Sequence, residues 1–183
     1  NYGLGFASGD YVVIYDAEDR PHPSQLKEAY ETFRKSPDSH VCLQAPLSVT
    51  NATSSWFSQF FAFEYCTHFK GLLPHLAKEN LPLPLGGTSN HFKREILVKC
   101  GAWDPYNVTE DADLGIRLAR LGYHTGVLKS PTLEDGPETI REWLPQRIRW
   151  QKGWMQTALV HSRNVREFIR SAGPRQAFYS TGI

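Results

Sequence analysis

The chain has 183 residues, a length typical of one domain, and 40% of them are apolar, which is enough for a sizeable core. With 21% charged residues and a formal net charge of +1, the composition excludes a disordered chain and gives no reason to expect a nucleic acid partner. The sequence contains no apolar run of the ~18 residues that a membrane-spanning helix requires.

The first predicted element is a strand over residues 11–15, a run of β-branched and aromatic residues that we expect to be buried. It leads directly into Asp16, Glu18 and Asp19. Ligands of open α/β sheets bind beyond the carboxyl ends of strands, and carboxylates are preferred by Mg²⁺ and Mn²⁺. Asp16 and Glu18 are therefore candidate metal ligands, with Asp19 either a further ligand or a residue that orients them. The alternative is an acidic turn without a ligand.

Two helices and a strand follow. A helix over 24–35 is expected to bury Leu26, Tyr30 and Phe33, and a strand is expected at 41–45. A second helix over 54–68 carries aromatic residues at helical spacing, and this stripe predicts core packing, with an interaction surface as the minority alternative. Glu64 lies within the stripe, and we interpret it as a carboxylate with a structural partner. The aromatic residues are Trp56, Phe57, Phe60, Phe61 and Tyr65.

A glycine-rich segment, Gly86 to Asn90, precedes a predicted helix near 94–100, and Thr109 is the predicted N-cap of a helix over 110–121 that ends at Gly122. Glu110, Asp111 and Asp113 fall in the first turns of that helix. The helix dipole stabilises carboxylates there, which is a sufficient structural explanation. The same field would also keep a catalytic base ionised.

The C-terminal part begins with a predicted strand over 123–128 and a loop over 131–137. A short helix is expected through Trp143, with Pro145 as the first residue of the next helix. Gln146, Arg149 and Trp150 share one face of that helix, whereas Arg147 is expected to point elsewhere. An arginine fork can pair with two phosphate oxygens, and an indole offers a flat face to a sugar.

Two other interpretations of this segment remain open. It can be a basic amphipathic helix that buries Trp143, Trp150 and Trp154, or an interfacial helix near a membrane. Residues 138–170 contain seven Lys or Arg and three Glu, whereas the rest of the chain is acidic overall. We therefore divide a single domain, 1–183, into an acidic region over 1–137 and a basic region over 138–170.

Together these motifs resemble the processive family 2 glycosyltransferases, the group that contains bacterial cellulose synthases. The match rests on Asp16-Ala17-Glu18, Thr109-Glu110-Asp111 and the Gln-x-x-Arg-Trp element that starts at Gln146. A Gly-Thr-Ser-Asn-His-Phe-Lys-Arg segment before the second element also resembles this family, as does the Glu-Asp-x-Asp-Leu-x-x-Arg-Leu-x-x-x-Gly pattern that continues from it. Glu18 replaces the second aspartate of the usual first element, which keeps an oxygen ligand on a longer side chain.

The resemblance implies an α/β domain of the GT-A type that binds a nucleotide-diphospho-sugar, with a UDP-sugar as the expected donor. It implies Mg²⁺ or Mn²⁺ on Asp16 and Glu18, and Asp111 as the base that deprotonates an acceptor saccharide. The residues that are expected to contact substrate are Glu110, Gln146, Arg149, Trp150, Gly87, Thr88, Ser89 and Asn90.

The family's N-terminal half has no counterpart here, so we expect a piece of a larger protein that is itself soluble and inactive. Cys42, Cys66 and Cys100 lack metal-ligand spacing and predict reduced, cytosolic thiols. The expected location is the cytoplasmic face of the cell membrane, reached through parent segments outside this chain.

The expected activity is inverting sugar transfer in β-glycan or exopolysaccharide synthesis. The alternatives are a metal-dependent phosphotransferase or nucleotidyltransferase, and a non-catalytic glycan-binding domain.

Overall fold

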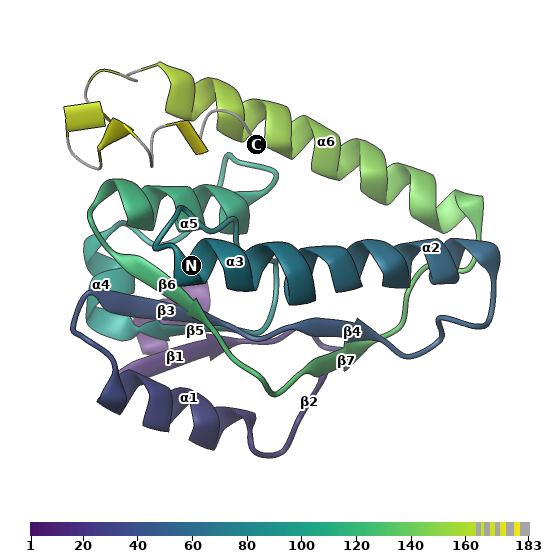
Figure 1. Cartoon of the computed structure of the whole chain (residues 1–183), viewed down its shortest axis with the longest axis horizontal. Helices are drawn as coiled ribbons and strands as arrows, with labels where there is room; N and C mark the ends of the chain where they lie inside the picture. The colour runs from purple at the N-terminus through teal and green to yellow at the C-terminus, as the bar shows by residue number, and fades with distance from the viewer. Residues whose placement is uncertain (164–165, 167–168, 171–172, 175–177, 180–183) are drawn as a thin grey trace.

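The computed structural model describes residues 1–163, 166, 169–170, 173–174 and 178–179. The last part of the predicted basic region, residues 164–165 and 167–168, lies outside the described residues. A four-stranded sheet and a three-stranded sheet form the middle of the molecule, with α1 on one side and α2, α3, α5 and α6 on the opposite side (Figure 1). The elements in chain order are a 3-10 helix (Tyr2–Phe6), β1 (Tyr11–Ile14), β2 (Arg20–Pro21), α1 (Gln25–Lys35), β3 (His40–Gln44), β4 (Leu47–Val49), α2 (Trp56–Tyr65), a π-helical segment (Cys66–Leu72), α3 (Leu73–Lys78), β5 (Asn90–Lys93), α4 (Arg94–Lys99), α5 (Glu110–Arg120), β6 (His124–Val127), β7 (Thr132–Glu134) and α6 (Ile140–Ser162).

The larger sheet has the order β1-β5-β3-β6, in which β5 is antiparallel to both neighbours and β6 is parallel to β3. Asn90, the first residue of β5, pairs with Ile14 at the end of β1 and with Gln44 at the end of β3. The acidic segment that follows β1 and the glycine-rich loop that precedes β5 are therefore brought to the same edge of the sheet.

The hydrophobic core lies between this sheet and the helices on its α3 and α5 side. Phe92 of β5 is 1% exposed, and Leu114 and Leu118 of α5 belong to the same buried cluster as Leu73 and Leu76 of α3. The start of α5 is thereby fixed against the sheet edge that carries the acidic segment.

The smaller sheet has the order β2-β7-β4, and the sequence analysis missed its central strand. Residues 131–137 were predicted to form a loop, but β7 lies within them, antiparallel to β2 and parallel to β4. Three residues between two prolines carry too little local signal to predict a strand, and the pairing partners of β7 are far away in the sequence. The strand ends at Glu134 and so brings this carboxyl group to the cavity that Asp16 and Asp111 also line.

Two predicted buried faces are wrong. Strand β1 is an edge strand that pairs only with β5 within the described sheet, so it is half-buried at most. Helix α1 buries Gln25, Ala29 and Phe33, whereas Leu26 and Tyr30 are exposed. The buried Gln25 side chain donates to the carbonyl of Ser130 at 3.1 Å, so a polar residue lies on the buried face beside Ala29 and Phe33.

The aromatic stripe predicted to be core is only partly buried. The helix does not end at His68 but continues from α2 through the π-helical segment into α3 (Figure 1). Phe61 is buried, whereas Trp56 is 67% exposed and Phe60 is 38% exposed. The stripe therefore follows an outer part of the molecule at its N-terminal end and enters the core only from Phe61 onward.

Helix α6 is one continuous helix of 23 residues, not two helices separated at Pro145. Thr139 caps it: the backbone N–H of Glu142 donates to the Thr139 hydroxyl at 3.4 Å, and the Glu142 carboxylate accepts from the N–H of Thr139. The cap places the helix start before Trp143, so Pro145 lies inside the helix. Within the described part of the chain, no helix is both long and apolar enough to cross a membrane.

Candidate active site

One cavity of about 730 Å³ collects side chains from all three of the polar clusters seen in the sequence. It lies between the edge of the larger sheet, the start of α5 and the N-terminal half of α6. The predicted site residues that line it are Asp16, Glu18, Gly87, Thr88, Glu110, Asp111, Gln146, Arg149 and Trp150. Ser89 and Asn90 do not line it.

The acidic segment after β1 forms a tight turn whose geometry is fixed by hydrogen bonds. The backbone N–H of Asp16 donates to Oδ2 of Asp19 at 2.9 Å and to the hydroxyl of Thr88 at 3.1 Å, and the Thr88 hydroxyl also contacts Asp19. The Asp19 carboxylate thus closes the turn and does not line the cavity. The carboxylates of Asp16 and Glu18 remain on the cavity wall.

The glycine-rich loop brings backbone close to the predicted base. A Cβ atom on Gly87 would lie 3.2 Å from Oδ2 of Asp111, so this position suits a residue without a side chain. Ser89 and Asn90 instead support the loop from inside: the Ser89 hydroxyl donates to Thr132 at 2.6 Å, and the Asn90 amide donates to the carbonyl of Gly86 at 2.6 Å.

Asp111 has a strongly perturbed carboxyl group. Burial raises its pKa to about 6, and the neighbouring Glu110 carboxylate adds to the rise. The backbone N–H groups of Asp111 and Ala112 and the charge of Arg149 act in the opposite direction. The backbone N–H groups at the helix start thus favour the ionised carboxylate, as expected, but burial has the larger effect on its pKa. A carboxyl that titrates near 6 is still mostly ionised at neutral pH, and it is a stronger base than an ordinary aspartate.

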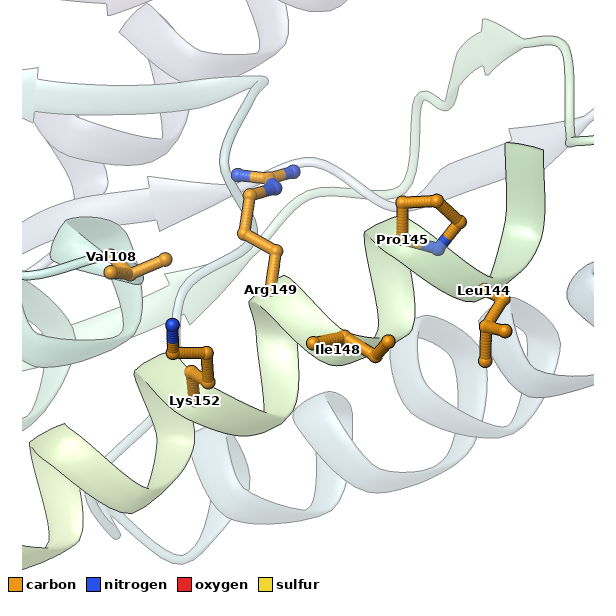
Figure 2. Close-up of a pocket in the computed structure, with 6 residues that line it drawn as sticks. All are labelled: Val108, Leu144, Pro145, Ile148, Arg149 and Lys152. Atoms are coloured by element: carbon orange, nitrogen blue, oxygen red, sulfur yellow. The ribbon is translucent and has the colours of Figure 1, made fainter. Parts of the chain in front are cut away.

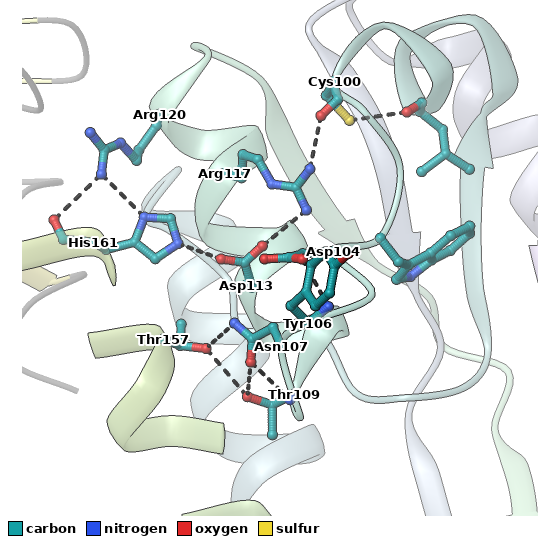
Figure 3. A network of polar contacts seen from close by, with 12 residues as sticks. Cys100, Asp104, Tyr106, Asn107, Thr109, Asp113, Arg117, Arg120, Thr157 and His161 are labelled. Carbon is teal, nitrogen blue, oxygen red and sulfur yellow. Dashed lines mark hydrogen bonds and ion pairs between the residues drawn. The ribbon is translucent and has the colours of Figure 1, made fainter. Parts of the chain in front are cut away.

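The remaining carboxylate of this helix start, Asp113, has structural partners. It is 4% exposed and pairs with Arg117 at 2.9 Å and with Nε2 of His161 at 2.9 Å (Figure 3). Burial opposes ionisation, but His161 and Arg117 hold the pKa of Asp113 below its usual range. This network ties α5 to the C-terminal half of α6.

Thr109 occupies the predicted N-cap position, but its side chain makes no capping hydrogen bond. Its hydroxyl lies 3.3 Å from that of Thr157 on α6, and Asn107 donates to Thr157 at 3.0 Å (Figure 3). A Cβ atom on Gly153 would lie 2.3 Å from the Thr109 side chain, so the two helices touch closely here. The Thr-Glu-Asp element is therefore packed directly against the helix that carries Arg149 and Trp150.

On the α6 side of the cavity, Arg149 forms no ion pair with the residues that the structure describes. Its charge opposes the rise in the pKa of Asp16 and of Asp111 that burial causes. The buried Oε1 atom of Gln146 likewise has no hydrogen-bond partner within the described chain. The Arg149 guanidinium is thus available to a ligand, whereas the Gln146 oxygen is a buried acceptor without a partner. Arg149 also borders a second hollow of about 510 Å³ with Lys152, Val108 and the apolar side chains of α6 (Figure 2).

The prediction for Arg147 is wrong. The arginine was expected to point elsewhere, yet it lines the same cavity as Gln146 and Arg149. Its long side chain reaches Glu64 on α2, and both Nη atoms donate to the Glu64 carboxylate. The prediction that Glu64 has a structural partner is confirmed, and its isolation in an apolar stripe was the signal that a cation had to lie opposite it.

Glu134 and Tyr65 are cavity residues that the sequence analysis missed. Burial raises the pKa of Glu134 to about 7, and the carboxylates of the acidic turn add to this rise. A hydrogen bond with Tyr65 acts in the opposite direction and lowers the pKa. No local pattern could have identified Glu134, because its place in the cavity depends on the unpredicted strand β7.

The acidic turn suits a divalent cation that is completed by a ligand. Burial raises the pKa of Asp16, and the Asp19 and Glu18 carboxylates raise it further, so a nearby cation would relieve repulsion. Within the described residues, no group of three or more His, Cys, Asp or Glu side chains is arranged to hold a metal ion. Two carboxylates fit the mode in which Mg²⁺ or Mn²⁺ keeps waters and binds substrate phosphates.

The cavity lies at the carboxyl edge of a mixed sheet, with carboxylates on one wall and Arg149 and Trp150 on the other. This arrangement agrees with the predicted GT-A-type α/β domain, a fold that the similarity to known glycosyltransferases confirms. The profile of the family described as "Glycosyl transferase family group 2" matches residues 11–179, and the chain belongs to this family. A mannosyltransferase from Pyrobaculum calidifontis, solved with GDP-Man and Mn²⁺, has the same fold: its TM-score is 0.65 at 18% identity, over 99% of this chain and 50% of that one.

Two curated relatives are more similar in sequence. "Probable glycosyltransferase YdaM" of Bacillus subtilis is 29% identical over 84% of this chain and 36% of its own length. The "Cellulose synthase catalytic subunit [UDP-forming]" of Pseudomonas fluorescens is 28% identical over 85% of this chain and 22% of its own length. The chain thus spans between 22% and 36% of these relatives.

Proposed function

We propose that the protein to which this chain belongs transfers a sugar, with inversion, from a nucleotide-diphospho-sugar to a hydroxyl of an acceptor saccharide. The observation that carries the proposal is the single cavity that joins Asp111, whose pKa is about 6, to two carboxylates on one side and to Arg149 and Trp150 on the other. A phosphate-bearing donor could bind Arg149 and a metal ion on the two carboxylates, and an uncharged acceptor saccharide could contact Asp111 and Trp150.

Asp111 is the proposed general base. An acceptor hydroxyl is a poor nucleophile at neutral pH, so a positioned base must take its proton as the oxygen attacks the anomeric carbon. Attack on the face opposite the leaving diphosphate inverts that carbon. Glu110 is close enough to raise the pKa of Asp111, and we assign it to acceptor contact and to tuning of the base.

Asp16 and Glu18 are the proposed ligands of Mg²⁺ or Mn²⁺. A bound metal ion would supply charge neutralisation for the leaving diphosphate. Arg149 offers a planar fork to phosphate oxygens, and Trp150 offers a ring face to a sugar. We assign substrate contact to Gln146 as well, because it lines the cavity between them. We assign substrate contact to Gly87 and Thr88 and a supporting role to Ser89 and Asn90.

The relatives' names narrow the substrates that merit testing first. One relative is a UDP-forming cellulose synthase subunit, and another is named "Probable glucomannan 4-beta-mannosyltransferase 10", from Arabidopsis thaliana. They support a hexosyl donor, with UDP as the first carrier to test, and a β-glycan product. Because the chain spans a minor part of each relative, we assign the activity to the complete protein and expect the chain alone to be inactive. The location that we propose for the complete protein is the cytoplasmic face of a membrane.

The test is a transfer assay on the full-length protein. UDP-glucose and GDP-mannose are each incubated with Mn²⁺ and with cellohexaose or mannohexaose, and the nucleotide product and the saccharide length are measured. Release of nucleoside diphosphate together with a longer saccharide is the expected result, and EDTA should abolish it.

Three other outcomes would overturn the proposal. Release of nucleoside monophosphate, with sugar phosphate on the acceptor, would identify a phosphotransferase, and release of sugar phosphate, with the nucleotide on the acceptor, would identify a nucleotidyltransferase. Saccharide binding without turnover, with the same affinity in the Asp111→Asn variant, would identify a glycan-binding domain, because binding alone requires no base.

A further inference from the structure

Arg147 lies within a shell of aromatic rings. Its guanidinium carbon is 4.8 Å from the ring centroid of Trp150 and 5.3 Å from the centroids of both Phe61 and Trp143. A guanidinium above an aromatic ring is attracted by the negative face of the ring, and more strongly where water is excluded. The Arg147 side chain is only 18% exposed.

Glu64 fixes the plane of this guanidinium. Nη1 of Arg147 donates to Oε1 of Glu64 at 3.1 Å, and Nη2 donates to Oε2. A paired contact of this kind restricts rotation of the guanidinium as well as neutralising its charge. Arg147 is therefore already paired, in contrast to Arg149 on the same helix, and it is Arg149 that remains available for phosphate.

The element that carries Glu64 is itself a wall of the cavity. Glu64 lies in the last turn of α2, and the π-helical segment Cys66–Leu72 begins two residues later. Thr67 and Phe69 of that segment line the same cavity as Trp150. Segments of π-helix occur often at functional sites. The Glu64–Arg147 pair thus connects two cavity walls next to the ring proposed to contact the sugar.

We propose that Glu64 and Arg147 are positioning residues that hold the Trp150 ring in place for the acceptor saccharide. This inference rests on the proposed function. Arg147 covers part of the Trp150 ring, and Phe61 and Tyr65 lie 6.1 Å and 6.5 Å from it, so the indole is ordered before the saccharide arrives. A side chain that is ordered in advance loses less conformational freedom on binding, and the acceptor binds more tightly.

The kinetic test uses the full-length protein with the donor and acceptor that support transfer in the assay above. Arg147→Met keeps the length of the side chain and removes both the fork and the charge, and Glu64→Gln removes the paired contact. Each should raise the KM for the acceptor about tenfold and leave the KM for the donor within twofold. Arg147→Lys should have nearly the same raised acceptor KM as Arg147→Met, because an ammonium group cannot replace the planar fork. Arg141→Met, an exposed arginine in the first turn of α6, is the matched control and should change neither KM.

A charge exchange separates positioning from simple helix attachment. The double variant Glu64→Arg with Arg147→Glu should recover part of the acceptor affinity that either single change loses. An acceptor KM within twofold of the wild type in both Arg147→Met and Glu64→Gln would overturn the proposal. Donor KM and acceptor KM rising together with a lower melting temperature would also overturn it, because the pair would then only attach α6 to α2.

A spectroscopic measurement decides the same point without turnover, so a failure of the proposed function remains distinguishable. The fluorescence difference between each protein and its Trp150→Phe counterpart isolates the Trp150 signal, and acrylamide quenching reports the exposure of that ring. Quenching of Trp150 should increase about twofold in Arg147→Met, as expected for a ring that loses its cover. Unchanged quenching would contradict the positioning role even if transfer were never detected.

Discussion

The two walls of the cavity are held in place in different ways. The acidic wall, with Asp16 and Asp111, follows from the backbone: β1 ends where β5 begins, and α5 starts against the same sheet edge. The α6 wall, with Arg149 and Trp150, depends on side-chain contacts that α6 makes with α5 and α2. Changes in the acidic wall should therefore affect the chemistry directly, whereas changes around α6 should affect where its side chains lie.

The largest effect is expected from Asp111→Asn, which removes the base and keeps the shape. Turnover in the full-length protein should fall about 10²–10⁴-fold. Donor affinity, measured by calorimetry, should remain within a few-fold. A loss of donor affinity as large as the loss of turnover would mean that Asp111 belongs to the donor site.

Stability provides the control for this variant. Burial raises the pKa of Asp111 to about 6, above the value of an unfolded aspartate, so the folded state loses stability as pH rises from about 4 to 6. The asparagine cannot ionise, and the variant should be up to about 2 kcal/mol more stable than the wild type at pH 7. A lower melting temperature would show that the loss of activity comes from damage to the fold.

The second prediction concerns the metal side of the acidic wall. Asp16→Ala should lower turnover about 100-fold, and higher Mn²⁺ concentrations should recover part of it, because Glu18 and the diphosphate remain as ligands. Asp10, an exposed carboxylate before β1, gives the matched control Asp10→Ala with unchanged activity. Full activity of Asp16→Ala in excess EDTA would contradict the metal assignment.

The third prediction tests the attachment of α6. His161→Ala removes one partner of the buried Asp113, and the protein should lose about 3 kcal/mol of stability. His161 and Arg117 lower the pKa of Asp113 against the effect of burial, so the stability from this carboxylate is present above pH ~4 and is lost as pH falls through the folded-state pKa. Thermal unfolding of both proteins should therefore differ most near neutral pH and converge in acid. A constant difference across that range would contradict the assignment.

The smallest effect is expected from Glu110→Gln. Glu110 raises the pKa of Asp111, so its neutralisation should move the acidic limb of kcat/KM to lower pH by less than about one unit. The wild-type limb should fall about tenfold per unit below pH ~6, because protonation removes the base. A limb that does not move in Glu110→Gln would show that another group controls it.

The acidic wall could largely be predicted from the sequence because its determinants are local. A strand that ends at Ile14, two residues before Asp16, and a helix that starts at Glu110 are each contained within a few residues. The environment of Asp111 could not be predicted, since the burial that raises its pKa comes from distant segments such as the Gly87 loop.

The contacts that attach the α6 wall could not be predicted from the sequence. Glu64 and Arg147 are 83 residues apart, and Asp113 and His161 are 48 apart, so neither pair produces a periodic signal. The strand β7 was missed for the same reason, because a three-residue strand is defined by its partners and not by its own composition.

The most direct test of the account is a structure of the full-length protein with Mn²⁺, a nucleotide-diphospho-sugar and an acceptor saccharide, trapped with the Asp111→Asn variant. The account predicts the acceptor hydroxyl about 2.6–3.2 Å from the side chain at position 111, with the metal ion on Asp16 and Glu18 and the diphosphate on Arg149. An acceptor hydroxyl placed against Glu110 or Glu134 instead, with position 111 out of hydrogen-bond reach, would contradict it.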